Sequence, residues 1–340
     1  MKILITGGCG FVGSNLCLFL KDKIKNSEVA SVDYLIKDYS YLNKIRLNNQ
    51  KIKNYKLDIR KKNSLDKLKK FDVIIDCCAE PAVELSKNDI FNSVQTNLIG
   101  TLNVLEKVRK DKSKLIFLSS SRVYPILESN KKFNYLKKKF KRNIFFNENT
   151  NILGKKTIYG FSKISSEALI EEYNYLYDFK YIINRFGLIT GSWQFGKVEQ
   201  GLVSLWLWRH FKKKNLSYNG YQGTGSQIRD VLYIEDLCNL ILLQIQSFDK
   251  IYNQVFCVGG SKKNAINLRQ LTQRCQNITG NFVKIKKNKS TSIYDIPYFI
   301  SSNVKVNKFY KWKPKYNLDV LLKNLYNWML SNEKVINKYF

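Results

Sequence analysis

A phenol and an ammonium group lie four positions apart at Tyr159 and Lys163, a spacing that places both on one face of a helix. An unperturbed phenol ionises near pH ~10, which is too high for a base at neutral pH. A neighbouring cation favours the phenolate and brings its pKa toward the working range. The pair therefore predicts a general base, Tyr159, supported by Lys163. In a chain rich in both residues the alternative is an ordinary helix face.

A serine-rich segment that contains Ser120 follows the apolar, strand-like residues 115–118. Side chains at the carboxyl end of a parallel strand face the crevice where ligands of open α/β sheets bind. From there Ser120 would hydrogen-bond a substrate oxygen or relay its proton. The alternative is a strand end that satisfies its own backbone. The coincidence with Tyr159 and Lys163 favours the chemical role.

Three glycines at three-residue spacing, Gly7, Gly10 and Gly13, separate an apolar run from an amphipathic stretch. A strand, a glycine turn and a helix form a cradle for a pyrophosphate, whose charge is met by N–H groups at the start of the helix. Asp33, about twenty residues further on, would accept hydrogen bonds from ribose hydroxyls and repel a 2′-phosphate. The pattern predicts NAD rather than NADP as the cofactor. A turn-capping aspartate is the alternative for Asp33.

These residues require a sheet that brings the ends of several strands together. Apolar strand-like runs alternate with helical patterns, which implies βαβ units and an α/β fold with a doubly wound parallel sheet. The strand-like runs cover residues 2–6, 29–33, 53–58, 73–78, 115–119 and 180–186. The longest connecting helices are expected at 89–108 and 162–177, and later helical patterns at 202–212, 235–246, 268–277 and 320–329.

The regular alternation fades after residue 185, which predicts two parts. Residues 1–185 are expected to form an NAD-binding domain, to which segments near 228–258 return. Residues 186–340 are expected to form mainly a smaller substrate-binding lobe.

Composition limits the class of protein. The 340 residues are 44% hydrophobic, enough for a large core and two lobes. Apolar runs stay short of the ~18 residues that span a membrane, and the initial strand leaves no room for a signal peptide. Seven cysteines without Cys-x-x-Cys spacing argue against a disulfide framework and a zinc site. We expect a cytoplasmic protein without a bound metal.

The net charge of +31 raises the possibility of a nucleic-acid partner. The lysines are spread along the chain, however, and their densest cluster, residues 131–142, has the composition of a solvated insertion. A chain that uses lysine generally in place of arginine and other polar residues has the same high net charge, so no nucleic-acid partner is expected. The positive field would still attract anionic sugar nucleotides.

Together with Arg229 and the residues that follow it, these motifs resemble the extended short-chain dehydrogenase/reductase family, the NAD-dependent sugar-nucleotide epimerases and dehydratases. The resemblance covers nearly the whole chain and includes Asn97-Leu98-Ile99-Gly100-Thr101 and Lys311-Trp312-Lys313-Pro314. It implies a Rossmann-type fold. It also implies a homodimer or higher oligomer, paired through the helices at 89–108 and 162–177.

The resemblance also implies specific contacts. The implied cofactor-binding residues are Gly7, Gly10, Phe11, Val12, Gly13, Asp33, Asp58, Ile59, Cys78, Ala79, Asn97, Tyr159 and Lys163. The implied substrate-binding residues are Glu80, Ser120, Gln194, Gln200 and Arg229. Asp58 would contact the adenine, and Arg229 the diphosphate of the substrate. Alternatives are an ion pair of Arg229 with Asp230 or Glu235, and rim charges at Glu80 and Glu84.

The resemblance narrows the reaction. Ser121 and Arg122 stand where 4,6-dehydratases carry an Asp-Glu pair, so epimerisation or simple oxidoreduction is favoured over dehydration. Residues 191–195 and 199–201 are similar to those of 2-epimerases that act on CDP-dideoxyhexoses, which favours a CDP-sugar. The alternatives are a C4 epimerase, decarboxylase or reductase acting on a UDP- or GDP-sugar, and a non-enzymatic NAD- or RNA-binding scaffold.

Three positions depart from the family pattern. Asp76 stands where many members carry a His or similar residue, and Leu188 stands where an Asn often contacts the sugar nucleotide. Ser292 stands in place of an Arg ahead of Asp295. The single histidine, His210, is expected to be packed or exposed rather than catalytic.

Overall fold

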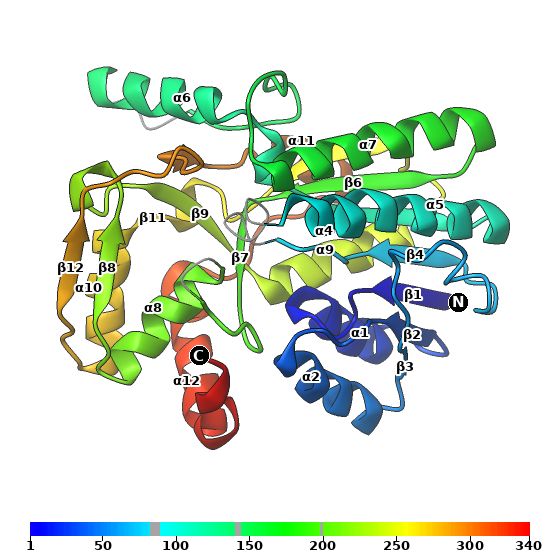
Figure 1. Cartoon of the computed structure of the whole chain (residues 1–340), viewed down its shortest axis with the longest axis horizontal. Helices are drawn as coiled ribbons and strands as arrows, with labels where there is room; N and C mark the ends of the chain where they lie inside the picture. Colours follow the sequence, from blue (N-terminus) through cyan, green and yellow to red (C-terminus); the bar gives the residue numbers. More distant parts are fainter. Residues whose placement is uncertain (82–88, 140–143, 198–199) are drawn as a thin grey trace. The chain divides into compact units, whose positions relative to one another are not determined.

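The structure is a computed structural model of the chain (Figure 1), and it describes residues 1–81, 89–139, 144–197 and 200–340, without the side chains of 135–139. It divides into two compact units. Unit 1 comprises Met1–Val123, Thr157–Arg185 and Leu237–Phe256, and unit 2 comprises Tyr124–Lys156, Phe186–Asp236 and Cys257–Phe340. Compared with the division predicted at residue 185, residues 124–156 group with unit 2.

A seven-stranded sheet forms the centre of unit 1 within the described residues. Its strands are β1 (Lys2–Thr6), β2 (Glu28–Val32), β3 (Lys53–Tyr55), β4 (Val73–Asp76), β5 (Lys114–Ser120), β6 (Tyr181–Phe186) and β10 (Gln254–Val258). They lie in the order β10-β6-β5-β4-β1-β2-β3, and the strands from β3 to β5 pair in parallel. The chain therefore reverses direction across the sheet between β1 and β4, where open α/β sheets bind their ligands.

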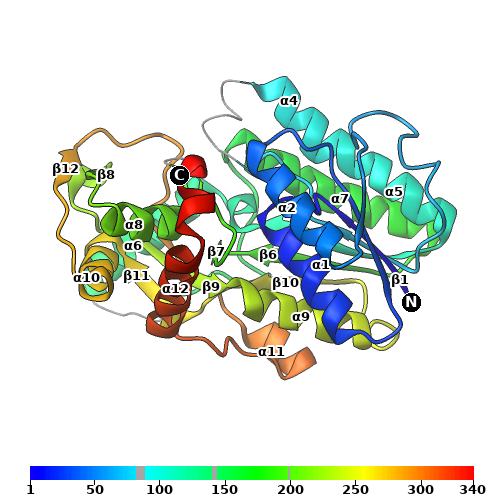
Figure 2. The same cartoon turned by 90° about the horizontal axis from the view of Figure 1, so that it is seen from below.

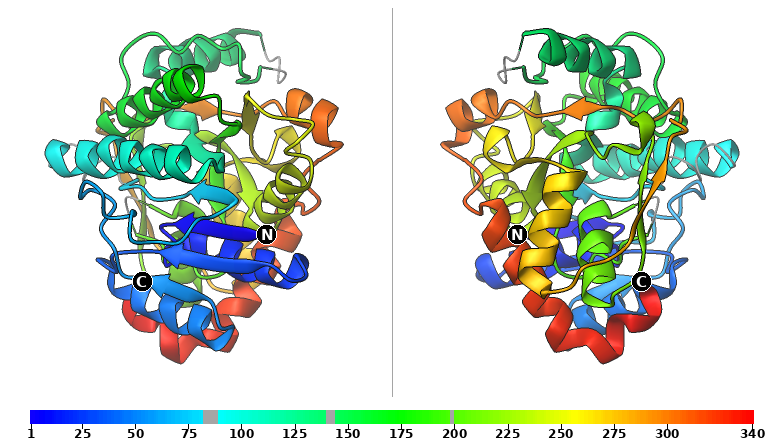
Figure 3. Two further views of the ribbon diagram at one scale, coloured as in Figure 1. Left: turned by 90° about the vertical axis from the view of Figure 1, so that its right-hand side faces the viewer. Right: turned by 90° about the vertical axis from the view of Figure 1, so that its left-hand side faces the viewer.

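Helices cover both faces of this sheet. They are α1 (Phe11–Lys23), α2 (Asp38–Asn49), α4 (Ile90–Val94), α5 (Gly100–Asp111), α7 (Ile158–Tyr177) and α9 (Ile234–Gln246). Figure 2 shows α1 and α2 in front of the sheet with α5 and α7 behind it, and Figure 3 shows the same layers from two further sides. This is the doubly wound Rossmann-type architecture that the alternation predicts.

The predicted helix at 89–108 differs from the structure in one respect. A π-helical turn, Gln95–Ile99, separates α4 from α5. The other long helix, α7, starts four residues earlier than predicted because Thr157 caps it, its hydroxyl accepting the N–H of Gly160 at 3.0 Å. Tyr159 therefore lies in the first turn of α7.

The core of unit 1 explains its uninterrupted apolar strands. Leu4, Ile74 and Phe117 are fully buried in one cluster with Val104 and Ile170 from α5 and α7. Strands covered on both faces need apolar residues at successive positions, and their burial contributes about 25 cal/mol per Å².

In its described part, unit 2 contains a four-stranded and a two-stranded sheet, together with the later helices. Its strands are β7 (Leu188–Thr190), β8 (Leu216–Asn219), β9 (Ile228–Tyr233), β11 (Ala265–Asn267), β12 (Ile285–Asn288) and β13 (Tyr298–Phe299). Its helices are α6 (Ile126–Lys139), α8 (Leu202–Phe211), α10 (Leu268–Thr279), α11 (Val304–Tyr310) and α12 (Leu318–Ile336). Helices α8, α10 and α12 pack on one another.

The lysine-rich segment 131–142 is not simply a solvated insertion. Its described part continues α6, in which Phe133 is buried, and the hydroxyl of Ser129 donates to the carbonyl of Tyr298 at 2.6 Å. Residues 140–143 lie outside the described part.

All seven cysteines are free thiols. Among the described helices, none is long and apolar enough to cross a membrane.

Candidate functional site

The glycine turn after β1 is closely packed. Gly7 has φ +62, and a Cβ atom there would lie 3.0 Å from the Cα of Cys78 in the segment after β4. A Cβ atom on Gly13 would overlap the carbonyl oxygen of Gly7. Helix α1 begins at Phe11, and its N-cap residue, Gly10, has no side chain to cap the first N–H groups of the helix. This geometry fits a pyrophosphate, with Phe11 and Val12 in the first turn.

Asp33 lies directly after β2 and turns its carboxylate toward the glycine turn. Its Oδ2 accepts the N–H of Cys9 at 3.0 Å, and its Oδ1 accepts that of Leu35 at 2.8 Å. Burial raises the pKa of Asp33, and both N–H groups counter that effect. Each carboxylate oxygen retains capacity for a further donor, so the residue suits ribose hydroxyls.

Asp58 is held by a neighbour. The Arg60 guanidinium grips both of its oxygens, with Nε to Oδ1 at 2.8 Å and Nη2 to Oδ2 at 2.7 Å, and this lowers the pKa of Asp58. Ile59 is buried, and its carbonyl accepts the Asn103 amide at 2.7 Å. β3 ends at Tyr55, before the predicted strand end at residue 58. The adenine contact of Asp58 and Ile59 stays a prediction.

The π-helical turn places Asn97 between the end of β4 and α7. The Asn97 side chain is fully buried; its Oδ1 accepts the N–H of Glu80 at 2.8 Å, and its Nδ2 donates to Ser162 Oγ at 3.0 Å. Asn97 thus fixes the segment of Cys78 and Ala79 relative to the helix that carries Tyr159. π-Helical turns are frequent at functional sites.

Ser120 and Tyr159 meet at the carboxyl end of β5. The Ser120 side chain hydrogen-bonds the phenol, and its Oγ accepts the N–H of Arg122 at 3.2 Å. Burial raises the pKa of Tyr159, whereas the Ser120 hydrogen bond and the Arg122 charge lower it. The site therefore contains the predicted hydroxyl pair and a nearby cation.

Lys163 is buried one turn after Tyr159, with its Nζ 4.0 Å from the centroid of the Phe117 ring. Burial lowers the pKa of Lys163, and the charge of Asp76 opposes this most strongly. The sequence assigned the lowering of the Tyr159 pKa to Lys163. In the structure, Ser120 and Arg122 are the groups that lower it, and burial outweighs both.

The charge of Glu80 raises the pKa of Tyr159, as the smallest of the effects on this phenol. Its Oε2 accepts Lys37 Nζ at 2.9 Å. Glu84, the other predicted acid, lies outside the described residues.

The remaining predicted substrate residues belong to unit 2. The buried Gln194 amide oxygen accepts hydroxyls of Thr190 and Ser204, each at 2.8 Å, so this side chain braces its own loop. Gln200 is exposed and bridges to Lys197 through the backbone.

Arg229 also lies in unit 2, on β9, and pairs with an acid that the sequence did not suggest. Its Nη2 lies 3.4 Å from Asp295 Oδ1 and also donates to the carbonyl of Ile296. The alternatives for its ion pair were Asp230 and Glu235. His210 is buried in α8, with Nδ1 2.8 Å from the carbonyl of Trp206, as expected for a packed residue.

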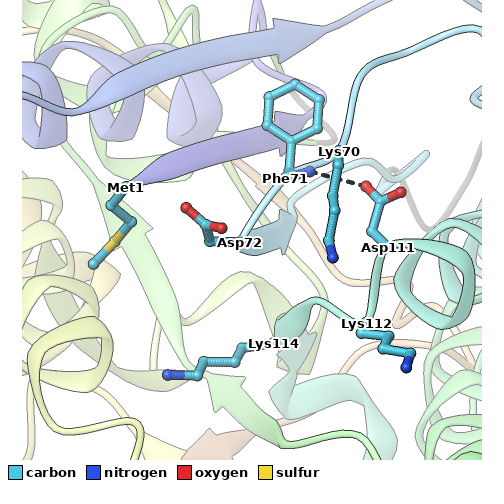
Figure 4. A pocket seen from close by; sticks show the side chains of 7 residues that line it. All are labelled: Met1, Lys70, Phe71, Asp72, Asp111, Lys112 and Lys114. Atoms are coloured by element: carbon cyan, nitrogen blue, oxygen red, sulfur yellow. Dashed lines mark hydrogen bonds between the residues drawn. The ribbon is translucent and has the colours of Figure 1, made fainter.

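A cavity of 410 Å³ lies elsewhere in unit 1 (Figure 4). Its lining residues lie just before β1 and β4, at the end of α5 and at the start of β5: Met1, Lys70, Phe71, Asp72, Asp111, Lys112 and Lys114. The cavity therefore sits at the amino ends of the strands, opposite the edge that carries Gly7, Ser120 and Tyr159.

Sequence reasoning did not assign Arg122 or Ser162 to the site. The position of Arg122, two residues after Ser120, could have indicated that its charge acts on the site; the sequence pointed to Arg122 only as a departure from the dehydratases. Ser162 lies three residues after Tyr159, but its bond to Asn97 depends on the π-helical turn.

Comparisons with known proteins agree with this geometry. Residues 3–259 match the model of the NAD dependent epimerase/dehydratase family. A CDP-paratose 2-epimerase of Salmonella typhi is 28% identical, over 97% of this chain and 100% of that protein. A putative UDP-glucose 4-epimerase of Methanocaldococcus jannaschii is 30% identical over 98% and 99%. The crystal structure of the Thermotoga maritima UDP-glucose 4-epimerase with UDP-glucose superimposes with a TM-score of 0.82, at 25% identity and coverage of 98% and 100%.

Proposed function

The chain belongs to the NAD dependent epimerase/dehydratase family, and we propose that it inverts one carbon of a nucleotide-linked sugar through a keto intermediate. The observation that carries this proposal is the contact of Ser120 with the Tyr159 phenol, one helical turn from the buried Lys163. These residues lie at the same edge of the sheet as the glycine turn. These residues give no comparable support to the alternative function, a non-enzymatic NAD- or RNA-binding scaffold.

NAD would be held by Gly7, Gly10, Gly13 and Asp33, and when bound it supplies a reversible hydride acceptor. Tyr159, as the phenolate, takes the proton of a sugar hydroxyl while the hydride leaves the same carbon. Ser120 donates a hydrogen bond to the reacting oxygen. After the keto-sugar rotates within the site, the hydride returns to the opposite face of the carbonyl carbon, and Tyr159 returns the proton to its oxygen.

We propose a CDP-linked dideoxyhexose as substrate and C2 as the inverted carbon, in line with the Salmonella typhi relative. Arg229 would bind the diphosphate, since its planar fork matches phosphate oxygens. The positive net charge would attract such a substrate. Ser121 and Arg122, in place of an acid pair, support epimerisation over dehydration.

One observation favours a second candidate, a C4 epimerase acting on a UDP-sugar. Both the Methanocaldococcus jannaschii relative and the Thermotoga maritima structure are described as UDP-glucose 4-epimerases. A substrate panel separates the candidates: CDP-, UDP- and GDP-sugars are incubated with catalytic NAD, and the products are identified by NMR. Inversion without net NADH supports an epimerase, and net NADH contradicts it.

The proposed base is tested in the same assay. Tyr159→Phe should lose about 10²–10⁴-fold in activity, the usual contribution of a general base. Tyr175→Phe is the matched control, since this exposed tyrosine lies on the same helix, α7. Activity of Tyr159→Phe within tenfold of the wild type would show that Tyr159 is not the base.

We also propose a cytoplasmic homodimer that pairs through α4–α5 and α7. Phe91 on α4 and Phe161 on α7 are 75% and 50% exposed. Large apolar side chains exposed on neighbouring helices are typical of a protein–protein interface. Phe161→Lys should shift the protein from dimer to monomer in sedimentation analysis. Phe282→Lys, at an exposed phenylalanine of unit 2, should leave the dimer intact.

A further inference from the structure

A buried carboxylate, Asp76, ends β4 at the edge of the sheet that carries the site. It is fully buried, and its hydrogen-bond partners among the described residues are neutral: Thr6 Oγ donates to Oδ1 at 2.5 Å, Thr101 Oγ to Oδ2 at 3.1 Å, and the N–H of Cys78 to Oδ1 at 3.3 Å. Neutral donors stabilise the carboxylate but leave its charge uncompensated. A cation nearby is therefore expected.

Strand register brings that cation close. Asp76 is the register partner of Thr6 on β1 and of Phe117 on β5, so the three side chains form one row on one face of the sheet. Adjacent strands lie about 4.8 Å apart. Lys163 descends from α7 onto this row, with its Nζ 4.0 Å from the centroid of the Phe117 ring. Its ammonium thus lies over the immediate neighbour of Asp76.

Lys163 needs an anion because it is only 1% exposed. An aromatic face attracts a cation, but it does not neutralise a buried charge. Four described groups raise the pKa of Lys163: Asp76, the thiols of Cys77 and Cys78, and Glu167. Burial raises the pKa of both thiols well above its usual value, so at neutral pH they carry no charge.

The charge of Glu167 is already compensated by an ion pair with Arg185. Arg185 binds its Oε2 through Nε at 3.0 Å and Nη2 at 2.7 Å, and Ser119 donates to its Oε1. Among the described groups that raise the pKa of Lys163, Asp76 is therefore the anion whose hydrogen-bond partners are all neutral. Its negative charge remains available to compensate the Lys163 ammonium.

We propose that Asp76 is a positioning residue that keeps the buried Lys163 protonated beside Tyr159. The inference rests on the proposed function for its purpose, because in that function the charge of Lys163 would lie one helical turn from the phenol that accepts the proton and at the edge of the sheet where NAD would bind. Asp76 itself touches neither the phenol nor the substrate in this scheme. The chain thus uses the position at which it departs from the family pattern to control the charge of Lys163.

The test is the titration of Lys163 in the intact protein, followed by NMR of ¹³C-labelled lysine side chains and assigned by the signal lost in Lys163→Met. In Asp76→Asn, which keeps the shape of the side chain, Lys163 should lose its proton at lower pH than in the wild type. Asp111→Asn is the matched control, since Asp111 is also buried in unit 1 and pairs with Lys107 at 2.9 Å. An unchanged Lys163 titration in Asp76→Asn, or an equal shift in Asp111→Asn, would overturn the proposal.

Two further measurements complete the test. If Asp76→Asn does not fold, the wild-type titration decides, because the proposal requires Lys163 to be protonated at pH 7 and a neutral Lys163 overturns it. If it folds, the alkaline limb of its kcat/KM profile should move to lower pH. The NMR titration needs no turnover, so a shifted Lys163 in a protein without epimerase activity contradicts the proposed function and supports this inference.

Discussion

Gly160 packs directly against the backbone of Arg122: a Cβ atom at position 160 would overlap the Arg122 carbonyl oxygen. The N–H of the same Arg122 donates to Ser120 Oγ, which in turn bonds the Tyr159 phenol. The first turn of α7 and the turn after β5 therefore set the geometry of the hydroxyl pair together.

Gly160→Ala tests this packing. The added methyl group must push the Arg122 turn away and displace Ser120 from Tyr159, and a misplacement of about 1 Å can cost ~10²-fold in rate. We expect kcat to fall by roughly that factor, with NAD affinity nearly unchanged. The control is Ala168→Gly on the exposed side of the same helix, which costs about 1 kcal/mol in stability but leaves the site intact. Equal kcat values for the two variants would show that the contact does not position the site.

Asp33 should decide between NAD and NADP. Asp33→Ser removes two acceptors for ribose hydroxyls and a charge that repels a 2′-phosphate, each hydrogen bond to a charged group contributing about 1.5–3 kcal/mol. The Kd for NAD should rise at least tenfold, and the ratio of NADP to NAD affinity should increase. Calorimetry measures both. Asp38→Asn, at an exposed acid in the first turn of α2, should change neither affinity; an unchanged ratio in Asp33→Ser would contradict the assignment.

Arg122 should control the acidic limb of the pH profile. Its positive charge lowers the pKa of Tyr159, so its removal in Arg122→Gln raises that pKa. The phenolate then forms only at higher pH, and the acidic limb of kcat/KM moves upward, with activity at neutral pH falling about tenfold for each unit that the pKa rises. Arg122→Lys keeps the charge and should restore the profile. If Arg122→Gln keeps the wild-type limb, the charge of Arg122 does not act on the base.

Arg229 should act on substrate binding rather than on the chemical step. Arg229→Lys loses the planar fork, and a charge-assisted contact of about 1.5–3 kcal/mol predicts a KM that rises by roughly tenfold or more with kcat unchanged. Steady-state kinetics at two salt concentrations measure this, with Arg269→Lys, at another arginine of unit 2, as control. An unchanged KM with a lower melting temperature would instead show that Arg229 serves to hold β9 against Asp295 and Ile296.

Much of unit 1 could be predicted because its signals are local. The strands lie within a few residues of their predicted bounds, and the glycine turn with Asp33 is determined by the segment from β1 to the end of β2. The spacing of Tyr159 and Lys163 likewise places them on one helix face, as α7 shows. The π-helical turn at Asn97 was not predicted, since hydrophobic periodicity does not distinguish it from the α-helix on either side.

The sequence by itself determined which residues can turn, cap or share a helix face, because these properties depend on neighbours along the chain. Only the tertiary structure decided the partners: Asp76 for Lys163, Arg122 for Tyr159 and Asp295 for Arg229. Each pair joins segments that lie far apart in the sequence and that the packing of the fold brings together. Charges interact through space rather than along the backbone, so the protonation state of the site is a property of the fold.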